Sequence, residues 1–327
     1  TQWSSSAASD VYKRQFASLA YQHKKKRTRR EIFLDEMDAV IPWQRLLSVV
    51  EPFYVEHPHG RKRLPLERMV RIYFMQQWFN LSDPGTEDAL YDIESMRRFA
   101  GIELGEDPVP DETSFVKFRH FLERHGLTEA IFTEVSALLD ERHLRLKSGT
   151  IVDATLISAP ASTNNRDKAR DPEMKQTRKG KQYYFGMKVH AGSDRRGLVH
   201  SLAFSDAATA DIKKLPELLH GKERELYGDR AYWSEDHRHC AKLAGVRYRV
   251  NRKAKPGRKL SEYHREVNRK RSSARACGEH AFRVVKHLWG FTKTRYRGIA
   301  KNAARAWTMF ALANLYLVRR RLMPAQC

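Results

Sequence analysis

Two isolated aspartates stand where a bare carboxylate is unusual. Asp153 interrupts the β-branched apolar run at 150–157, TIVDATLI, whose composition predicts a buried strand. Asp229 follows Gly228 at the point where a second short strand, beginning at Glu225, ends. A charge in a buried strand is costly unless it is paired or binds a metal, so Asp153 is either half of a structural ion pair or a functional group. Asp229 is either a plain turn residue or a carboxylate that points into a cleft.

A third carboxylate, Glu279, belongs to a segment with the spacing of an amphipathic helix. The segment at 275–286 reads RACGEHAFRVVK. Arg275, Glu279 and Lys286 lie four and seven residues apart and therefore share one face. A surface ion pair is the ordinary interpretation of Arg275 and Glu279, although an Arg that precedes the Glu is the less favourable orientation. A second face carries an apolar stripe of Ala281, Val284, Val285 and Leu288.

The three carboxylates would form a chemically coherent site if they converged. As bare anions they would repel one another, and divalent cations relieve that repulsion. Carboxylate oxygens are hard ligands, which select Mg²⁺ or Mn²⁺ over zinc. Two such ions roughly 4 Å apart stabilise the attacking and leaving oxygens of a phosphoryl transfer. The sequence therefore raises the question of whether Asp153, Asp229 and Glu279 meet in the fold.

The charge balance indicates the class of partner. The 327 residues include 61 Lys and Arg against 39 Asp and Glu, a formal net charge of +22. A protein this basic typically binds nucleic acid, with a membrane surface as the other candidate. A phosphodiester substrate suits an acidic pocket inside a basic surface, because cations hold the backbone while metals offset the carboxylates. The basic residues that we expect to contact DNA are Arg275, Lys286, Lys188, Arg178, Lys179, Arg295 and Arg297.

Hydrophobicity and cysteine usage bear on the compartment. No run of about eighteen apolar residues occurs, so we expect no transmembrane helix and no membrane partner. The three cysteines are few, odd in number and far apart, and they form neither a disulfide framework nor a zinc signature. This usage is typical of a reducing compartment, and we expect a cytoplasmic protein.

Composition divides the chain into three parts. Residues 1–30 are predicted to be a disordered basic segment, in which 1–15 resemble non-native sequence and the run KKKRTRR at 24–30 is either a solvated arm or a phosphate contact. Residues 31–147 are predicted to form an all-helical DNA-binding or dimerisation domain of about five helices, with a weak helix-turn-helix signal. The helix starts are marked by Pro42, Pro65, the turn at 82–85, Asp111 and Thr128.

Residues 148–327 are predicted to form an α/β domain. Asp211 is expected to cap a helix at 211–219. The basic stretches at 160–181 and 251–271 are expected to be long loops. Strands are expected at 150–157, 183–191, 198–204, 225–228 and 247–250, and further helices at 234–244 and 302–317.

The order of strand Asp, strand Asp and helix Glu resembles that of the DDE transposases, which have a ribonuclease-H-like catalytic core. More specifically, the chain is similar to insertion-sequence transposases of the IS-four/IS-five superfamily, IS-five type. The main motifs are IVDAT from Ile151, GDRAY from Gly228 and RACGEHAFRVVK from Arg275. The Arg, Glu and Lys of the last motif match the family, whereas Ser272 stands where the family has Tyr. Further similar stretches are MQQWFNLSDP from Met75, PDET from Pro110, DKARDPEM from Asp167, FGMK from Phe185 and RYRGIAKN from Arg295.

The resemblance implies an α/β fold with a ribonuclease-H-like mixed sheet flanked by helices, preceded by an all-helical N-terminal domain. It implies that Asp153, Asp229 and Glu279 are catalytic and bind two Mg²⁺ or Mn²⁺ ions. Water would cleave the element's ends, and the freed 3′-hydroxyl would attack target DNA. The helical domain would bind the terminal inverted repeats or mediate dimerisation, and the protein would act as a homodimer at the bacterial nucleoid. The alternatives are a Mg²⁺-dependent nuclease without strand transfer and a catalytically inactive DNA-binding relic.

Overall fold

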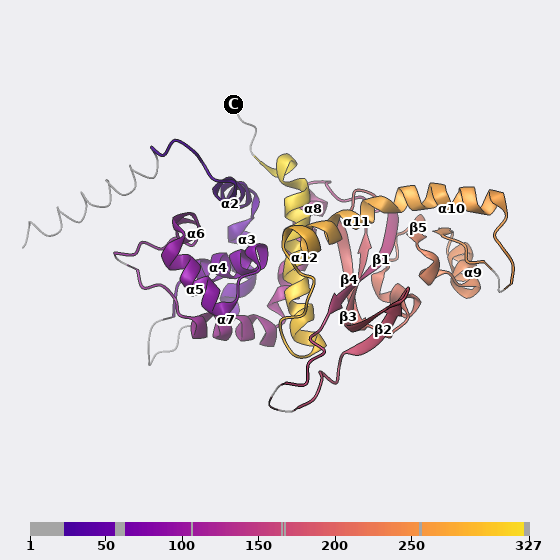
Figure 1. The fold of residues 1–327 in the computed structure, drawn as a ribbon. Coiled ribbons are helices and arrows are strands. Elements are labelled where there is room, and N and C mark those ends of the chain that lie inside the picture. Colours follow the sequence, from indigo (N-terminus) through magenta and orange to yellow (C-terminus); the bar gives the residue numbers. More distant parts are fainter. Residues whose placement is uncertain are drawn as a thin grey trace, which may run out of the picture.

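The protein consists of a helical half and a half built around one mixed sheet (Figure 1). No helix in the described part of the chain combines the length and apolarity needed to cross a membrane. The computed structural model describes residues 23–55, 63–105, 107–164, 166, 168–254 and 257–323.

The helical half follows the periodicity of its apolar residues. In α7, for example, Phe115, Phe118 and Leu122 are buried, while the Asp111 side chain caps the start by accepting the Ser114 N–H at 2.7 Å. The α-helices are α2 (Arg29–Val40), α3 (Trp43–Val50), α4 (Leu66–Phe79), α5 (Asp83–Asp92), α6 (Glu94–Phe99), α7 (Glu112–Arg124) and α8 (Leu127–Glu141), with a 3₁₀ turn η1 at Glu51–Phe53.

Some helix boundaries differ from those predicted. Helix α2 begins inside the segment predicted to be disordered, because Thr28 and Glu31 form a reciprocal capping box. The single helix predicted to end near Gly101 is two helices, α5 and α6, because Ile93 adopts an extended backbone conformation. Helix α8 begins directly after Gly126, so Thr128 lies inside it and is not its cap. The predictions for residues 1–22 fall outside the described residues.

The second half is a six-stranded sheet in which β1 is central. Strand β1 pairs antiparallel with β3 and parallel with β5, and β5 pairs parallel with β6. Strands β2 and β4 pair antiparallel with different lengths of β3. The predicted α/β ribonuclease-H-like fold, a mixed sheet flanked by helices, is confirmed. The strands are β1 (Gly149–Ser158), β2 (Lys175–Lys179), β3 (Gln182–Ser193), β4 (Val199–Asp206), β5 (Glu225–Gly228) and β6 (Arg247–Val250).

The elements around the sheet include two that were predicted to be loops. Residues 175–179 form β2, an exposed strand with no apolar alternation. Residues 262–275 form α10, whose only buried residue is Asn268, so its sequence has no apolar stripe from which a helix could be predicted. The other elements are the 3₁₀ segments η2 (Asp211–Leu218), η3 (Arg230–Tyr232) and η4 (Ala276–Gly278), the π-helical turn η5 (Val284–Leu288), and α9 (Glu235–Leu243), α10 (Glu262–Arg275), α11 (Glu279–Arg283) and α12 (Ile299–Leu322).

Helix α12 joins the two halves. It stands between them in Figure 1 and contacts α2, α4 and α8 on one side and β3 and β4 on the other. One apolar core therefore runs through both halves, and Phe310 and Leu312 of α12 are fully buried in it. The division of the chain at residue 147 remains a prediction about folding units.

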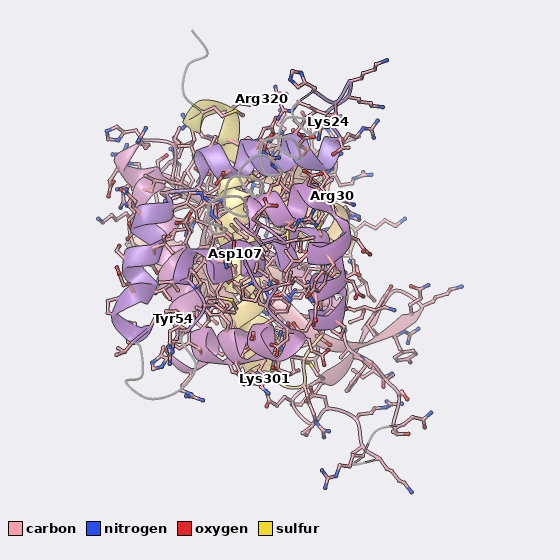
Figure 2. The ribbon with its side chains drawn as sticks, turned by 90° about the vertical axis from the view of Figure 1, so that its left-hand side faces the viewer. Lys24, Arg30, Tyr54, Asp107, Lys301 and Arg320 are labelled. Carbon is pink, nitrogen blue, oxygen red and sulfur yellow. The ribbon has the colours of Figure 1, made fainter. Side chains whose placement is uncertain are left out.

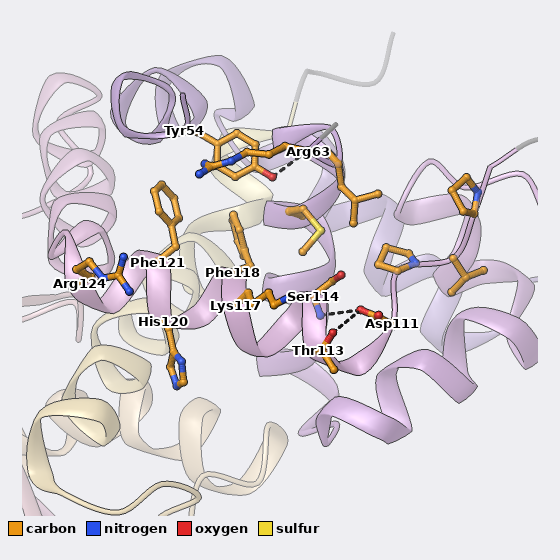
Figure 3. Close-up of a pocket in the computed structure, with 15 residues that line it drawn as sticks. Tyr54, Arg63, Asp111, Thr113, Ser114, Lys117, Phe118, His120, Phe121 and Arg124 are labelled. Atoms are coloured by element: carbon orange, nitrogen blue, oxygen red, sulfur yellow. Dashed lines mark hydrogen bonds between the residues drawn. The ribbon is translucent and has the colours of Figure 1, made fainter. Parts of the chain in front are cut away.

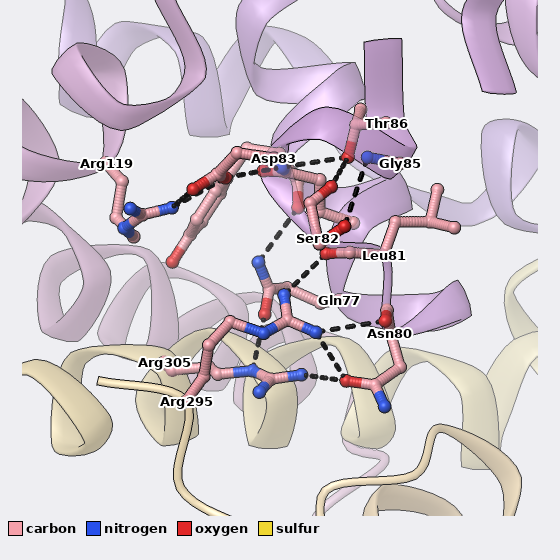
Figure 4. Close-up of polar contacts among 12 residues, drawn as sticks. Gln77, Asn80, Leu81, Ser82, Asp83, Gly85, Thr86, Arg119, Arg295 and Arg305 are labelled. Carbon is pink, nitrogen blue, oxygen red and sulfur yellow. Dashed lines mark hydrogen bonds and ion pairs between the residues drawn. The ribbon is translucent and has the colours of Figure 1, made fainter. Parts of the chain in front are cut away.

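Polar contacts reinforce this junction at the turn between α4 and α5 (Figure 4). Arg305 of α12 is 3% exposed, and its guanidinium donates to Gln77 Oε1 at 3.0 Å and Asn80 Oδ1 at 2.8 Å. Arg295 donates to the Leu81 carbonyl at 2.5 Å and to Asn80 Oδ1 at 2.7 Å. These charge-assisted hydrogen bonds tie the motifs around Asn80 and Arg295 together across more than two hundred residues of sequence.

Candidate active site

A cavity of about 660 Å³ opens where β5 stops and β1 continues. Strand β5 pairs with β1 only at Gly149–Ile151, so this edge of β1 carries no β5 partner from Val152 onward. The cavity is lined by Asp153, Asp229 and Glu279, which come from a strand, a strand end and a helix. Its lining also includes Arg275, Lys286, Lys188, Arg178 and Lys179.

Each carboxylate has a defined place in the local structure. Asp153 lies opposite Ala191 in the sheet, and its Oδ1 accepts the Ala154 N–H at 2.9 Å. Asp229 caps η3 by accepting the Ala231 N–H at 2.8 Å. Glu279 is the first residue of α11, and its side chain is 61% exposed.

Two glycines next to the acidic residues allow close packing. A Cβ on Gly278 would lie 2.8 Å from Ile151 Cγ2, and a Cβ on Gly228 would lie 3.0 Å from Val152 Cγ2. Both distances are shorter than normal van der Waals contact, so a larger residue would push the backbone away from β1. Glycine therefore lets the residue that follows, Glu279 or Asp229, stand beside the strand that carries Asp153.

The Arg275 guanidinium provides the opposite charge within the acidic group. Nη1 lies 3.9 Å from Asp229 Oδ2, and Nη2 lies 3.9 Å from Glu279 Oε1. The predicted pair between Arg275 and Glu279 therefore exists, but it extends to the second aspartate. Burial raises the pKa of Asp153 to about 6, the Arg275 charge opposes that rise, and the charges of Asp229 and Glu279 add to it.

The donor set fits a hard divalent cation. Three carboxylates face one cavity, and a cation would offset both the burial of Asp153 and its repulsion by Asp229 and Glu279. Within the described residues, no three His, Cys, Asp or Glu side chains approach closely enough to form a ready-made metal site. Arg275 contacts two of the carboxylates instead.

Lys286 reaches the cavity from a distorted part of the helix. Its Nζ donates to Thr155 Oγ1 at 3.0 Å and to the Leu156 carbonyl at 3.1 Å, so it anchors to the open edge of β1. Burial, with help from the Lys179 charge, lowers its pKa. The residues from 284 to 288 form a π-helical turn, which rotates Leu288 out of the predicted apolar stripe and leaves it 54% exposed.

Asp211 also lines the cavity, and the sequence prediction assigned it another role. The predicted helix cap is wrong, because Asp211 is the first residue of η2 and Ala210 precedes it without a side-chain cap. Its Oδ1 instead accepts the Lys188 Nζ at 2.8 Å, and Lys188 also donates to the Thr209 carbonyl. Lys188 is therefore engaged in an internal ion pair in the DNA-free protein, and its predicted contact with DNA stays a prediction. The sequence signal that could have indicated this pair is the place of Lys188 at a polar position of β3.

Two further predicted DNA contacts lie away from the lining of this cavity. Arg295 donates hydrogen bonds to Asn80 and Leu81 at the junction, and its predicted contact with DNA stays a prediction (Figure 4). Arg297 is exposed but does not line the cavity. Ser272, which stands where the family has Tyr, accepts a hydrogen bond from Asn251 Nδ2 at 2.8 Å.

Comparison with protein families accounts for most of the chain. A family described as a transposase domain matches residues 21–121. A second family, described as a transposase DDE domain, matches residues 144–315 and so covers more than half of the 327 residues. Members of the second family are metal-dependent DNA phosphoryl transferases. The protein therefore belongs to the DDE transposases, of the IS-four/IS-five-like kind.

Proposed function

We propose that this transposase binds the terminal inverted repeats of an insertion sequence and catalyses Mg²⁺-dependent cleavage and strand transfer with two metal ions. The observation that carries the proposal is that Asp153, Asp229 and Glu279, from three separate elements, line one cavity. Mn²⁺ is the alternative ion, because both metals prefer carboxylate oxygens. Membership of the IS-five type remains part of the proposal.

Each residue of the cavity would have its own role in the reaction. Asp153, Asp229 and Glu279 would hold the ions, which supply Lewis-acid activation of the scissile phosphate and of the attacking water or 3′-hydroxyl. Lys286 and Lys179 would bind phosphate oxygens at the rim. Two of the three Lys286 N–H donors are taken by Thr155 and Leu156, which fixes the direction of the third. Arg275 would exchange its carboxylate contacts for a phosphate when DNA enters.

The proposal also covers the domains of the chain, its binding to chromosomal DNA and its oligomeric state. We infer that residues 148–327 form the catalytic domain and 31–147 a DNA-binding or dimerisation domain. The net charge of +22 supports binding to chromosomal DNA at the bacterial nucleoid. A homodimer would place one catalytic cavity at each end of the element.

The test is a metal titration with a labelled duplex that carries the element's own end, taken from the DNA flanking the gene. Products are separated on a denaturing gel after incubation with Mg²⁺, with Mn²⁺ or with EDTA. Cleavage followed by joining to a target duplex supports the proposal. Cleavage without joining favours a nuclease, and binding without cleavage in either metal favours an inactive DNA-binding relic.

A further inference from the structure

A second cavity, of about 620 Å³, lies on the helical half and is not part of the catalytic centre. Its floor includes Tyr54, Phe118 and Phe121, whose rings pack against one another. Its rim is cationic, as Figure 3 shows, and carries Arg63, Lys117, His120 and Arg124.

Three of these basic side chains form one stripe on α7. Lys117, His120 and Arg124 follow at spacings of three and four and are all exposed, because the opposite face of the helix is buried. The stripe is about 10 Å long at a rise of about 1.5 Å per residue. Along one DNA strand, phosphates are spaced about 3.4 Å apart in the direction of the axis, so the stripe matches the scale of a few phosphates.

Arg63 is held in a fixed position beside the stripe. Its guanidinium lies 4.8 Å from the centre of the Tyr54 ring and 6.0 Å from that of Phe121. The Tyr54 hydroxyl in turn donates to the Leu64 carbonyl at 2.9 Å, which ties the segment that follows Arg63 to the same floor. An orientation set by cation–π contact lowers the entropy cost of placing the planar guanidinium against two oxygens of a phosphate.

Lys117 and Arg124 take no part in the ion pairs that hold the described residues of the helical half together. Other arginines of the helical half make ion pairs, as Arg45 does with Glu134, Arg71 with Glu67 and Asp38, and Arg119 with Asp83. Neither Lys117 nor Arg124 makes such a pair with any residue in the part of the chain that the structure describes.

Two acidic side chains, Asp111 and Glu123, lie near the stripe, and within the described residues neither makes an ion pair with Lys117 or Arg124. Asp111 caps α7, and hydrogen bonds from Ser114, together with the Lys117 charge, lower its pKa. Glu123 has a raised pKa, chiefly through burial, and the charges of His120, Arg119 and Lys301 oppose that rise. Lys301 thus adds a further positive charge near this face, and Figure 2 places it at the same end of the helical half as Tyr54.

We propose that this face of α7, together with Arg63, binds the phosphate backbone of the element's end. The inference rests on the proposed function, because it takes DNA as the substrate, and it adds the surface through which the helical half would contact that DNA. Binding at such a site is predominantly electrostatic, so its signature is a dependence on salt and not on base sequence.

The test compares two double variants that remove the same charge. Lys117→Ala with Arg124→Ala changes the stripe, and Arg320→Ala with Arg321→Ala changes two exposed arginines in the last turn of α12. Figure 2 places Arg320 at the opposite end of the view from Tyr54 and Lys301. Fluorescence anisotropy with a labelled duplex of mixed sequence gives the Kd over a salt series. We expect the slope of log K against log salt to become shallower by about 2 for the α7 variant, roughly 0.9 per lost phosphate contact, and to stay near wild type for the α12 variant.

The outcomes separate this inference from the proposed function. If the wild type binds DNA and the α7 variant keeps its slope, the inference is wrong and the proposed function stands. Equal losses in both variants would also overturn the inference, because the effect would then reflect net charge alone. If the wild-type protein does not bind the duplex or the element's end, the proposed function itself fails. Thermal unfolding should be unchanged in the α7 variant, because both side chains are exposed and unpaired within the described residues.

Discussion

Replacing Arg275 by alanine is expected to strengthen the binding of a divalent cation to the DNA-free protein. The Arg275 guanidinium lies 3.9 Å from an oxygen of Asp229 and 3.9 Å from an oxygen of Glu279. A cation that binds these carboxylates must break both contacts or lie next to a positive charge. The variant removes this competition and leaves all three carboxylates in place.

The size of the effect follows from distance and exposure. Two unit charges about 4 Å apart attract by about 4 kcal/mol at an effective dielectric constant of about 20. The side chains of Asp229 and Glu279 are 40% and 61% exposed, so solvent reduces each contact to about 0.5–1 kcal/mol. The two contacts together amount to about 1–2 kcal/mol, which corresponds to a Kd lower by a factor of about 5–30.

Isothermal titration calorimetry with MnCl₂ measures this Kd directly, without DNA and without catalysis. Arg275→Lys is the matched control, because it keeps the positive charge and should bind Mn²⁺ about as the wild type does. A Kd for Arg275→Ala equal to or weaker than that of the wild type would refute the idea that Arg275 competes with the cation. Tighter binding in both variants would show that shape, and not charge, sets the competition.

Further predictions concern packing, phosphate binding and pH. Gly278→Ala should cost about 1–3 kcal/mol in unfolding free energy and lower cleavage, because the new Cβ would lie 2.8 Å from Ile151 Cγ2. The control in urea denaturation is Gly105→Ala, whose new Cβ would meet nothing within 4 Å. Equal unfolding free energies of the two variants would contradict the packing argument. Lys286→Ala should weaken DNA binding and make its salt slope shallower by about 1; an unchanged slope would return Lys286 to a purely structural role. Burial, with help from His220, lowers the pKa of His200 to about 3, so the folded state keeps this ring neutral while the unfolded chain takes up a proton below its usual pKa of about 6.5. The unfolding free energy should therefore fall by up to about 2 kcal/mol through His200 as the pH is lowered from 6.5 to 5. Thermal unfolding at both pH values should show a smaller fall in stability for His200→Phe than for the wild type. The same fall in both proteins would exclude His200 as its source.

The carboxylates of the candidate site were predictable because two of them are charged residues in or next to buried strands. Asp153 is a charge within a buried apolar strand, and Asp229 ends a strand whose four residues are all buried. Such local conflicts tend to mark functional sites. Asp211 was missed because an acidic residue before an apolar stretch usually caps a helix, and its contact with Lys188 depends on β3 packing beside η2.

Elements without an apolar pattern were not predictable from periodicity. Helix α10 buries only Asn268, and β2 is exposed along most of its length. The role of Arg295 depends on α12 lying against the turn that follows α4, a contact between residues 214 and 215 positions apart in the chain. The exposure of Leu288 follows from a π-helical turn, which changes the side-chain spacing on which the predicted stripe relied.

The most direct test of the central claim is single-turnover cleavage of a labelled duplex carrying the element's end in Mg²⁺. The wild type is compared with Asp153→Asn, Asp229→Asn and Glu279→Gln, and the Kd for the same duplex is measured in parallel without metal. If the three carboxylates act together on the metal ions, each variant binds the duplex with a Kd near that of the wild type and yields no cleavage above background. Full cleavage by any one of the three variants would contradict the assignment of that residue and with it the shared site.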